Sequence, residues 1–444
     1  MKGCLKFSAV VLALFAGAVL IFHGRKSDSE KAARSRLEIY FMYGEGETQQ
    51  RWFAGAIERW KAQNPGLEVE ASYPGRELLG KMRPRLIIGN PPDMANQSSD
   101  ELRALLVDEL VMPLDEYFNE KAYGQDAAWK DTFLPGLLEA YSYKGHLYMV
   151  PQGLFAYVFF YNIDQFEKLG LKKPRTWSEF LQVCDVLKKN GIEPVAADGN
   201  IRDYNALWYP YLITRTTTLE HILDTARGEA DASWAESPYV EAATRLRELR
   251  ERGYIMQGYE ASGFPSAQMQ WIQGKCAMLL CATWIPKEMK EKLPEGYRMG
   301  IFPFPVFEEH PEASGNALAM EIEAFVIPKT AKHPRAALEF LKFITSPEES
   351  RHLVEIDIAT AVKGAGMPPA LAGLEEALAP PTRICRLAAN MAIETPDWYR
   401  TVARETWSQY FLGNYTPEGM CKMVDEATKR FYEQRAARKG EEQR

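Results

Sequence analysis

The pattern of apolar and polar positions near the start of the chain predicts an α/β unit. Residues 37–43 are apolar at nearly every position, which is typical of a strand covered on both faces. Apolar residues then recur at helical spacing from Trp52 to Trp60, and residues 67–71 alternate as a second strand. This order of strand, helix and strand indicates parallel strands joined by a crossing helix.

The same patterns return along the rest of the chain. Thr176 and Glu179 have the spacing of a capping box, and buried-type residues follow them to Leu187. A second strongly helical stretch covers residues 334–345. Further strands are expected at 277–280, 299–302 and 324–327, and a further helix at 416–432. The chain is therefore expected to alternate strands and helices throughout.

The N-terminal 36 residues do not fit this pattern. Lys2 and Lys6 precede an uninterrupted run of apolar or small residues at 7–22, and this is the pattern of an export signal. The run is short for a membrane-spanning helix, which needs roughly 20 residues. Its small residues lie inside the run, so both a cleaved signal peptide and an uncleaved anchor stay open, with residues 23–36 as a charged tether. We expect an exported protein, periplasmic or tethered to the outer face of a membrane.

Length and charge limit the number of domains and the classes of function that the chain can have. A chain of 444 residues predicts two to three domains, at roughly 100–200 residues each. Its net charge of −7 argues against nucleic-acid binding, which needs a basic face. Aromatic residues make up 12% of the chain. They could fill a core or form flat walls around a ligand, and composition alone does not separate these roles.

Cysteine and histidine usage predicts neither a metal site nor a cofactor. Cys4 precedes the apolar run, and the other five cysteines cannot all pair because their number is odd. The chain contains no C-x-x-C motif, and its six histidines are scattered. Buried free thiols are the expected state of the five.

Familiar catalytic motifs are absent from the sequence. We find no G-x-x-x-x-G-K-[ST] loop, no H-E-x-x-H and no G-x-S-x-G elbow. Acidic pairs occur at Glu45 and Glu47 and at Glu321 and Glu323, but 60 acidic residues produce such pairs by chance. A glycosidase would need two placed carboxylates, and surface positions explain these pairs more simply. The sequence therefore predicts a protein that is not an enzyme.

A series of segments in a fixed order is more informative than any single motif. In the first half of the chain they are LIIGNPPD at 86–93, YKGHLYMVP at 143–151, FFYN at 159–162, FEKLGL at 166–171, PRTWSEF at 174–180 and NGIEPV at 190–195. Later come GKCAM at 274–278, TW at 283–284 and AALEFLKFITSPE at 336–348. In this order they resemble the extracellular solute-binding proteins of the carbohydrate type, which serve ABC sugar importers and are similar to maltose-binding protein. The resemblance spans roughly residues 37–432. The chain departs from the family pattern at Pro84, which lies where the family has an uninterrupted helix, and at Ala282, which replaces a family glycine. It also lacks a lipidation motif.

The resemblance implies an α/β, two-lobed periplasmic-binding-protein fold. Each lobe is expected to be a mixed sheet flanked by helices, with hinge crossovers and a ligand cleft between the lobes. The expected divisions are 1–36 for the signal peptide or signal-anchor with its tether, 37–150 and 298–350 for lobe one, and 151–297 and 351–444 for lobe two.

The resemblance also selects candidate ligand-binding residues. Trp284 lies where the family places a stacking residue, and Trp398 where relatives often contribute another platform; a core position is the alternative for both. The other candidates come from loops after strands, where ligands gather in α/β lobes. They are Glu45, Gln97, Asp203, Tyr204 and Trp208, with Tyr43 and Gln152 as weaker candidates. For Trp208, lobe packing is an equal alternative, and Glu321 and Glu323 are left as surface residues.

The implied function is capture of a sugar or oligosaccharide and its delivery to the membrane permease subunits of an ABC importer. No cofactor and no nucleic acid is expected to take part, and the protein is expected to be a monomer. A tethered extracytoplasmic carbohydrate sensor is the first alternative, because the N-terminal run could be an uncleaved anchor. A glycoside-processing enzyme using Glu45 or Asp203 is the second.

Overall fold

The computed structural model describes residues 36–229, 231–379 and 381–442, which form two compact units. Unit 1 contains the described residues up to Thr132, together with Tyr143–Val150 and Ala324–Glu349. Unit 2 contains Phe133–Ser142, Pro151–Glu323 and the described residues from Ser350. The boundary between the units falls inside two long strands, β4 (Val150–Asn162) and β8 (Ala317–Val326).

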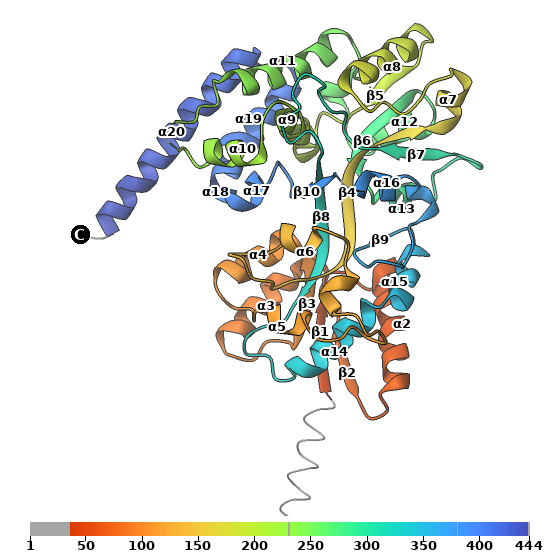
Figure 1. Ribbon diagram of the computed structural model, residues 1–444, viewed down its shortest axis with the longest axis vertical. Coiled ribbons are helices and arrows are strands. Elements are labelled where there is room, and N and C mark those ends of the chain that lie inside the picture. Colours follow the sequence, from red (N-terminus) through yellow and green to blue (C-terminus); the bar gives the residue numbers. More distant parts are fainter. Residues whose placement is uncertain (1–35, 230, 380, 443–444) are drawn as a thin grey trace, which may run out of the picture. The chain divides into compact units, whose positions relative to one another are not determined.

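Unit 1 is built on a parallel sheet in which β1 lies between β2 and β3. Its strands and α-helices are β1 (Arg36–Phe41), α2 (Thr48–Gln63), β2 (Glu68–Ser72), α3 (Leu78–Ile87), β3 (Met94–Ser98), α4 (Ser99–Val107), α5 (Asp115–Phe118), α14 (Pro334–Ile344) and the start of α15 (Pro347–Val354) (Figure 1). The alternating residues Leu37, Ile39 and Phe41 are fully buried, as the apolar run predicts. The Phe41 ring packs 4.3 Å from that of Phe53 on α2.

A half-buried ion-pair cluster ties α14 to the segment after α5. The Glu120 carboxylate accepts hydrogen bonds from Arg335 at 2.7 Å and from the buried Lys342 ammonium at 2.5 Å. The Arg335 guanidinium and the Lys342 ammonium hold the pKa of Glu120 below its ordinary value of 4.5. Because the pKa is lowered in the folded state, the stabilisation is complete above pH 4.5 and is lost as the pH falls through the folded-state value.

We therefore expect the Glu120→Gln variant to be less stable than the parent at neutral pH and to lose less of its remaining stability in acid. The measurement is urea unfolding from neutral pH to below pH 4.5. Glu77→Gln is the control, because its partner Lys81 forms an exposed pair, which contributes little. An unchanged acid dependence in Glu120→Gln would contradict the expectation.

Unit 2 holds the larger share of the helices. Its strands are the greater part of β4 and β8, with β5 (Glu193–Ala196), β6 (Cys276–Ala282), β7 (Met299–Phe302), β9 (Ala359–Thr360) and β10 (Arg383–Cys385). Its α-helices are α6 (Leu137–Ala140), α7 (Ile163–Lys168), α8 (Trp177–Lys189), α9 (Arg202–Thr216), α10 (Leu219–Ala226), α11 (Ser237–Glu251), α12 (Ser266–Ile272), α13 (Ile285–Met289), α16 (Leu374–Leu378), α17 (Met391–Glu394), α18 (Pro396–Trp398), α19 (Arg404–Phe411) and α20 (Pro417–Glu442).

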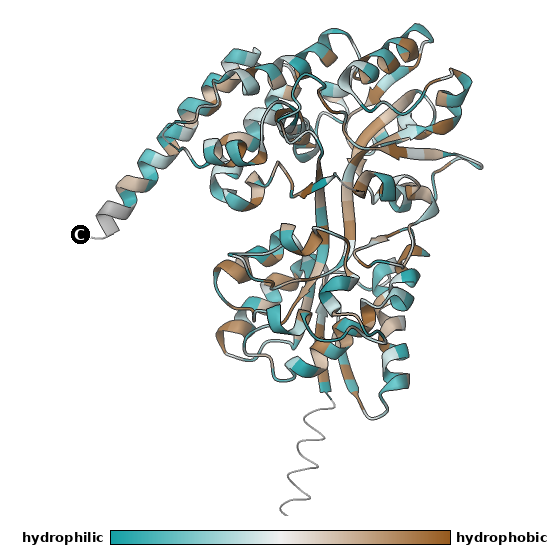
Figure 2. Cartoon of the chain, viewed as in Figure 1, coloured by the Kyte–Doolittle hydropathy of each residue, from teal (hydrophilic) through white to brown (hydrophobic). Residues whose placement is uncertain are grey.

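The sheet of unit 2 is centred on β4, which pairs antiparallel with β6, β7 and β9, while β5 extends the sheet parallel to β6. β6 is buried at every position, and Figure 2 shows the hydrophobic colouring along β4 and β6. The buried helix α9 packs against α11 and α19, and α20 packs against α11. The unit therefore has a sheet layer and a helical layer with a continuous apolar core.

Two segments lie outside the lobes in which the sequence placed them. Residues 298–323 were expected in lobe one but belong to unit 2, because β7 pairs with β4. Residues 133–142 were also expected in lobe one but belong to unit 2. The backbone N–H of Leu134 donates to the carbonyl of Ala361, and Arg386 donates to the carbonyl of Ala140. Such long-range contacts are not visible in a local pattern.

Several local predictions are confirmed. Thr176 and Glu179 form the capping box of α8, and Cys184, Cys276, Cys281, Cys385 and Cys421 are buried and free.

The last helix was expected to end at 432 but continues to Glu442. The apolar run at 7–22 lies outside the described residues. Within the part of the chain that the structure describes, every helix is too short or too polar to cross a membrane.

Candidate functional site

The position of Trp284 is set by the pairing of β4 with β6. The backbone N–H of Thr283 donates to the carbonyl of Ala156 at 3.0 Å, and the N–H of Ala156 donates to the Thr283 hydroxyl at 3.1 Å. The register pairs Tyr157 with Ala282. The chain then turns into α13, which places Trp284 beside β4.

Two aromatic side chains of β4 meet the Trp284 ring. Phe155 and Tyr157 are two residues apart and therefore share one face of the strand. Their ring centroids lie 5.8 and 5.7 Å from that of Trp284, and the Tyr157 ring stands at 83° to the indole plane. Both β4 rings are buried, whereas Trp284 is half-buried. Trp284 is thus the ring of this group that can offer a face to a ligand.

Tyr204, in the first turn of α9, supports the indole from another element. Its hydroxyl is hydrogen-bonded to the Trp284 side chain and to the Cys281 thiol. Burial, with smaller contributions from Cys281 and Glu288, raises the pKa of Tyr204, so this hydroxyl stays protonated at neutral pH. Tyr204 therefore anchors Trp284 by a neutral hydrogen bond.

Two carboxylates from β8 complete this surface. The Tyr157 hydroxyl makes a long contact of 3.4 Å to a carboxylate oxygen of Glu321. A Cβ built on Gly153 would lie 3.3 Å from a carboxylate oxygen of Glu323, so that side chain packs against the β4 backbone. We call the group the aromatic–acidic surface. Its members are Phe155, Tyr157, Tyr204, Trp284, Glu321 and Glu323, all in unit 2.

The chemistry of this surface suits a polyhydroxylated ligand. Aromatic rings give a flat apolar contact for C–H faces, and they do so at low entropic cost. Carboxylate oxygens accept hydrogen bonds from hydroxyl groups. Glycine at position 153 leaves room for Glu323, because a larger side chain there would crowd the carboxylate.

The structure places two of the predicted tryptophans in the core of unit 2. Trp208 packs among Phe159, Phe304 and Phe411, with the last ring stacked at 25°. Trp398 is also buried. The core alternative is thus the one that the structure supports for Trp208, because protein rings already cover its faces.

Trp398 stacks on Trp234 at 13° with 5.3 Å between centroids, and its indole N–H donates to the Thr428 hydroxyl at 2.9 Å. Trp407 approaches the same ring edge-on. Since its polar group and its ring are both engaged within unit 2, the platform role expected for Trp398 is replaced by core packing.

Asp203 and Gln152 have different environments from those expected. Asp203 is exposed and forms a two-pronged ion pair with Arg404, and its expected contact with ligand stays a prediction. Gln152 is almost fully buried in β4, and neither amide atom has a hydrogen-bond partner among the described residues. Buried polar groups are nearly always satisfied, so Gln152 stays a candidate for a contact with ligand or water.

The remaining predicted residues lie together in unit 1. Tyr43 and Glu45 follow β1, and Gln97 lies near the end of β3. Since β1 and β3 run parallel, these residues share the carboxyl edge of the sheet. Tyr43 and Gln97 are buried, Glu45 is exposed, and the Gln97 amide oxygen accepts from the N–H of Ser98. The structure thus brings these three together at one sheet edge.

Four members of the aromatic–acidic surface were not among the residues predicted from the sequence to bind ligand. Phe155 and Tyr157 carried a usable signal, because they alternate with Ala156 in a strand that leads to the FFYN segment. Glu321 and Glu323 alternate in the same way but were taken for surface charges. Only the pairing of β4 with β8 could place Glu321 beside Tyr157 and Glu323 beside Gly153.

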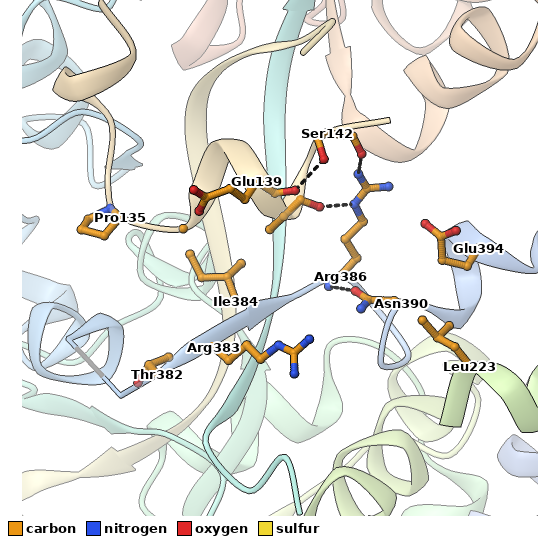
Figure 3. Close-up of a pocket in the computed structure, with 12 residues that line it drawn as sticks. Pro135, Glu139, Ser142, Leu223, Thr382, Arg383, Ile384, Arg386, Asn390 and Glu394 are labelled. Carbon is orange, nitrogen blue, oxygen red and sulfur yellow. Dashed lines mark hydrogen bonds between the residues drawn. The ribbon is translucent and has the colours of Figure 1, made fainter. Parts of the chain in front are cut away.

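Unit 2 also contains a pocket of about 520 Å³ next to α6, β10 and α17. Figure 3 shows Arg386 in this pocket, with its guanidinium donating to the carbonyls of Ala140 and Ser142. The backbone N–H of Arg386 donates to the Asn390 side chain at 2.7 Å. Among its described lining residues there is no aromatic ring, so the pocket lacks the flat contact found at Trp284.

Comparison with known proteins identifies the relatives of this chain. The model of the bacterial extracellular solute-binding protein family matches residues 44–350, more than half of the chain. The diacetylchitobiose-binding protein NgcE of Streptomyces coelicolor is 25% identical over 68% of this chain, and the chain spans 65% of that protein's length. The multiple sugar-binding protein of Streptococcus mutans is 23% identical over 78% of this chain and 80% of its own length.

Solved structures agree in fold. The apo form of RafE from Streptococcus pneumoniae superposes with a TM-score of 0.71 at 22% identity, covering 89% of this chain and 97% of RafE. The α/β, two-lobed class expected from the sequence is therefore confirmed at the level of the fold.

Proposed function

Because the chain belongs to the family of bacterial extracellular solute-binding proteins, we propose that it binds a sugar or oligosaccharide outside the cytoplasm and delivers it to the permease of an ABC-type importer. The observation that carries this proposal is the half-buried Trp284, held by Tyr204 and flanked by Phe155 and Tyr157. The relatives named for diacetylchitobiose and for multiple sugars support the choice of carbohydrate.

Binding at the aromatic–acidic surface needs no chemical step. The Trp284 ring stacks on the C–H face of a pyranose, and burial of that face is favoured by the hydrophobic effect. Glu321 and Glu323 accept hydrogen bonds from hydroxyls at the sugar's edge. Gln152, in the same unit, is a further polar group that we assign to this ligand. Tyr43, Glu45 and Gln97 of unit 1 stay predictions from the sequence.

The family and the structural neighbours are binding proteins, and the family is an exported one. We propose that this chain likewise turns over no substrate and acts as a monomer. Incubation with labelled oligosaccharides should leave them intact, and the appearance of shorter products would overturn this part of the proposal.

A tethered sensor is the second candidate. The observation that favours it is the apolar run at 7–22, which has its small residues inside the run rather than after it. Determining the mature N-terminus, together with the neighbouring genes, separates the two: an anchored chain without permease genes nearby would favour the sensor.

The proposed function is tested by a thermal-shift screen against monosaccharides, oligosaccharides, peptides and divalent metals. A ligand that binds only the folded state stabilises it by about 2.7 kcal/mol at a hundredfold excess over Kd, so the correct sugar should raise Tm measurably. The Trp284→Ala variant is the matched control and should lose most of the shift. Stabilisation by peptides or metals, with none by any carbohydrate, would refute the sugar assignment.

A further inference from the structure

Unit 1 exposes an unusual set of apolar side chains. The large hydrophobic residues that the described chain leaves exposed are Ile87 at 85%, Ile88 at 74%, Val107 at 54% and Phe264 at 53%. The first three belong to unit 1 and only Phe264 to unit 2. A cluster of exposed apolar residues on a soluble unit commonly marks an interaction surface.

The topology of unit 1 places these three residues at one end. α3 returns from the end of β2 to the start of β3, so Ile87 and Ile88 lie near the beginnings of the parallel strands. α4 leaves the end of β3 and runs back in the same direction, which brings Val107 to that end as well.

Direct contacts support this placement. The backbone N–H of Lys329 donates to the carbonyl of Leu110, three residues after Val107. The Lys332 ammonium donates to the Asn90 side chain at 2.6 Å, two residues after Ile88. The short segment 329–332 therefore joins the end of α4 to the end of α3.

This is also the end at which the described chain begins. Arg36 starts β1, and Arg85 of α3 forms an ion pair with Glu38 of the same strand. Residues 23–35 separate the apolar run at 7–22 from Arg36. Thirteen residues span at most roughly 45 Å even when fully extended, so an anchored run would keep this end close to the membrane.

We propose that this end of unit 1, which we call the entry end, lies against the lipid surface of the membrane that holds the run at 7–22. Ile87, Ile88 and Val107 enter the boundary between headgroups and acyl chains, where apolar side chains are favoured. Arg83 lies one helical turn before Ile87 on the same exposed face of α3. Its guanidinium reaches the lipid phosphates, while the methylene part of its side chain lies against apolar groups. The inference does not depend on which ligand the protein binds.

Charges around the entry end are mixed, so apolar contact rather than net charge carries the proposal. Lys329 and Lys332 are matched by Asp108 and Glu109 in the same region. Binding should therefore persist at high salt, which screens exposed charges but not apolar burial.

The test uses the full chain carrying Cys4→Ser and a single Ile88→Cys or Val107→Cys, labelled with an environment-sensitive fluorophore. The five remaining native cysteines are buried, so the introduced thiol reacts first. The protein is reconstituted into vesicles of phosphatidylethanolamine and phosphatidylglycerol with a quencher attached to the lipid. Phe264→Cys in unit 2 is the matched control, because its exposed fraction equals that of Val107 within a percentage point.

We expect severalfold stronger quenching by the lipid at positions 88 and 107 than at position 264, at both low and high salt. Equal and weak quenching at all three positions would overturn the proposal. If position 88 is shielded from aqueous iodide but is not quenched by lipid, the patch is covered by protein, either the chain's own N-terminal run or a second copy. That result would also overturn the proposal. So would a mature chain that begins after residue 22 and fails to co-sediment with the vesicles. A normal circular dichroism spectrum shows that each variant is folded.

Discussion

Replacing Trp284 with alanine is expected to weaken sugar binding by about 2 kcal/mol, or roughly 30-fold in Kd, while the fold is retained. The indole is the half-buried ring of the aromatic–acidic surface, and its removal takes away the flat contact for the sugar face. Phe155 and Tyr157 stay in place, because β4 lies between β8 and β6 in the sheet. Isothermal titration calorimetry with the sugar found by thermal shift measures the loss.

Trp284→Phe is the matched comparison. It keeps an aromatic face but loses the hydrogen bond to Tyr204, so its affinity should lie between those of the parent and the alanine variant. Without ligand, the free energy of unfolding of both variants is expected to stay within about 1 kcal/mol of the parent, as is usual for a partly exposed position. Global unfolding of Trp284→Ala would instead assign the residue to the core.

Replacing Trp398 with alanine is expected to lower the free energy of unfolding by about 3–5 kcal/mol, as for other buried aromatic residues cut back to alanine. The ring is buried among Trp234 and Trp407, and its removal leaves a cavity between α18 and the helices packed on it. The hydrogen bond from the indole to Thr428 of α20 is lost as well. Chemical denaturation followed by circular dichroism measures the change.

Trp398→Phe separates the two losses. It refills most of the volume but donates no hydrogen bond, and Thr428 keeps its bond to the carbonyl of Val424. Its destabilisation should therefore be clearly smaller than that of Trp398→Ala. Sugar affinity per folded molecule should be unchanged in both variants. Normal stability together with lost sugar affinity would return Trp398 to the binding site.

The local elements of this protein are readable in its sequence, because they depend on neighbours only a few residues apart. The capping box at Thr176 and Glu179 needs contacts across three residues. The buried strand at the start of β1 follows from consecutive apolar positions. The order of the motifs was sufficient to identify the family, and the match at 44–350 confirms it.

The residues of the candidate site are harder to predict from the sequence, because the same residue type can pack in the core or stay exposed at a surface. Trp284, Trp208 and Trp398 were all candidate ligand contacts by resemblance to the family, yet only Trp284 is left half-buried. Asp203 pairs with Arg404, some two hundred residues away in the chain. A contact of that kind has no trace in the local pattern.

By itself, then, the sequence determined the α/β class and the family, and it predicted export and buried free thiols. These follow from short-range periodicity, composition and motif order. Tertiary structure decided which rings are buried and which stay partly exposed, which unit holds residues 298–323, and that Glu321 lies beside Tyr157 and Glu323 beside Gly153. The reason is physical: strand pairing fixes register between distant segments, and register decides whether a side chain meets solvent, core or ligand.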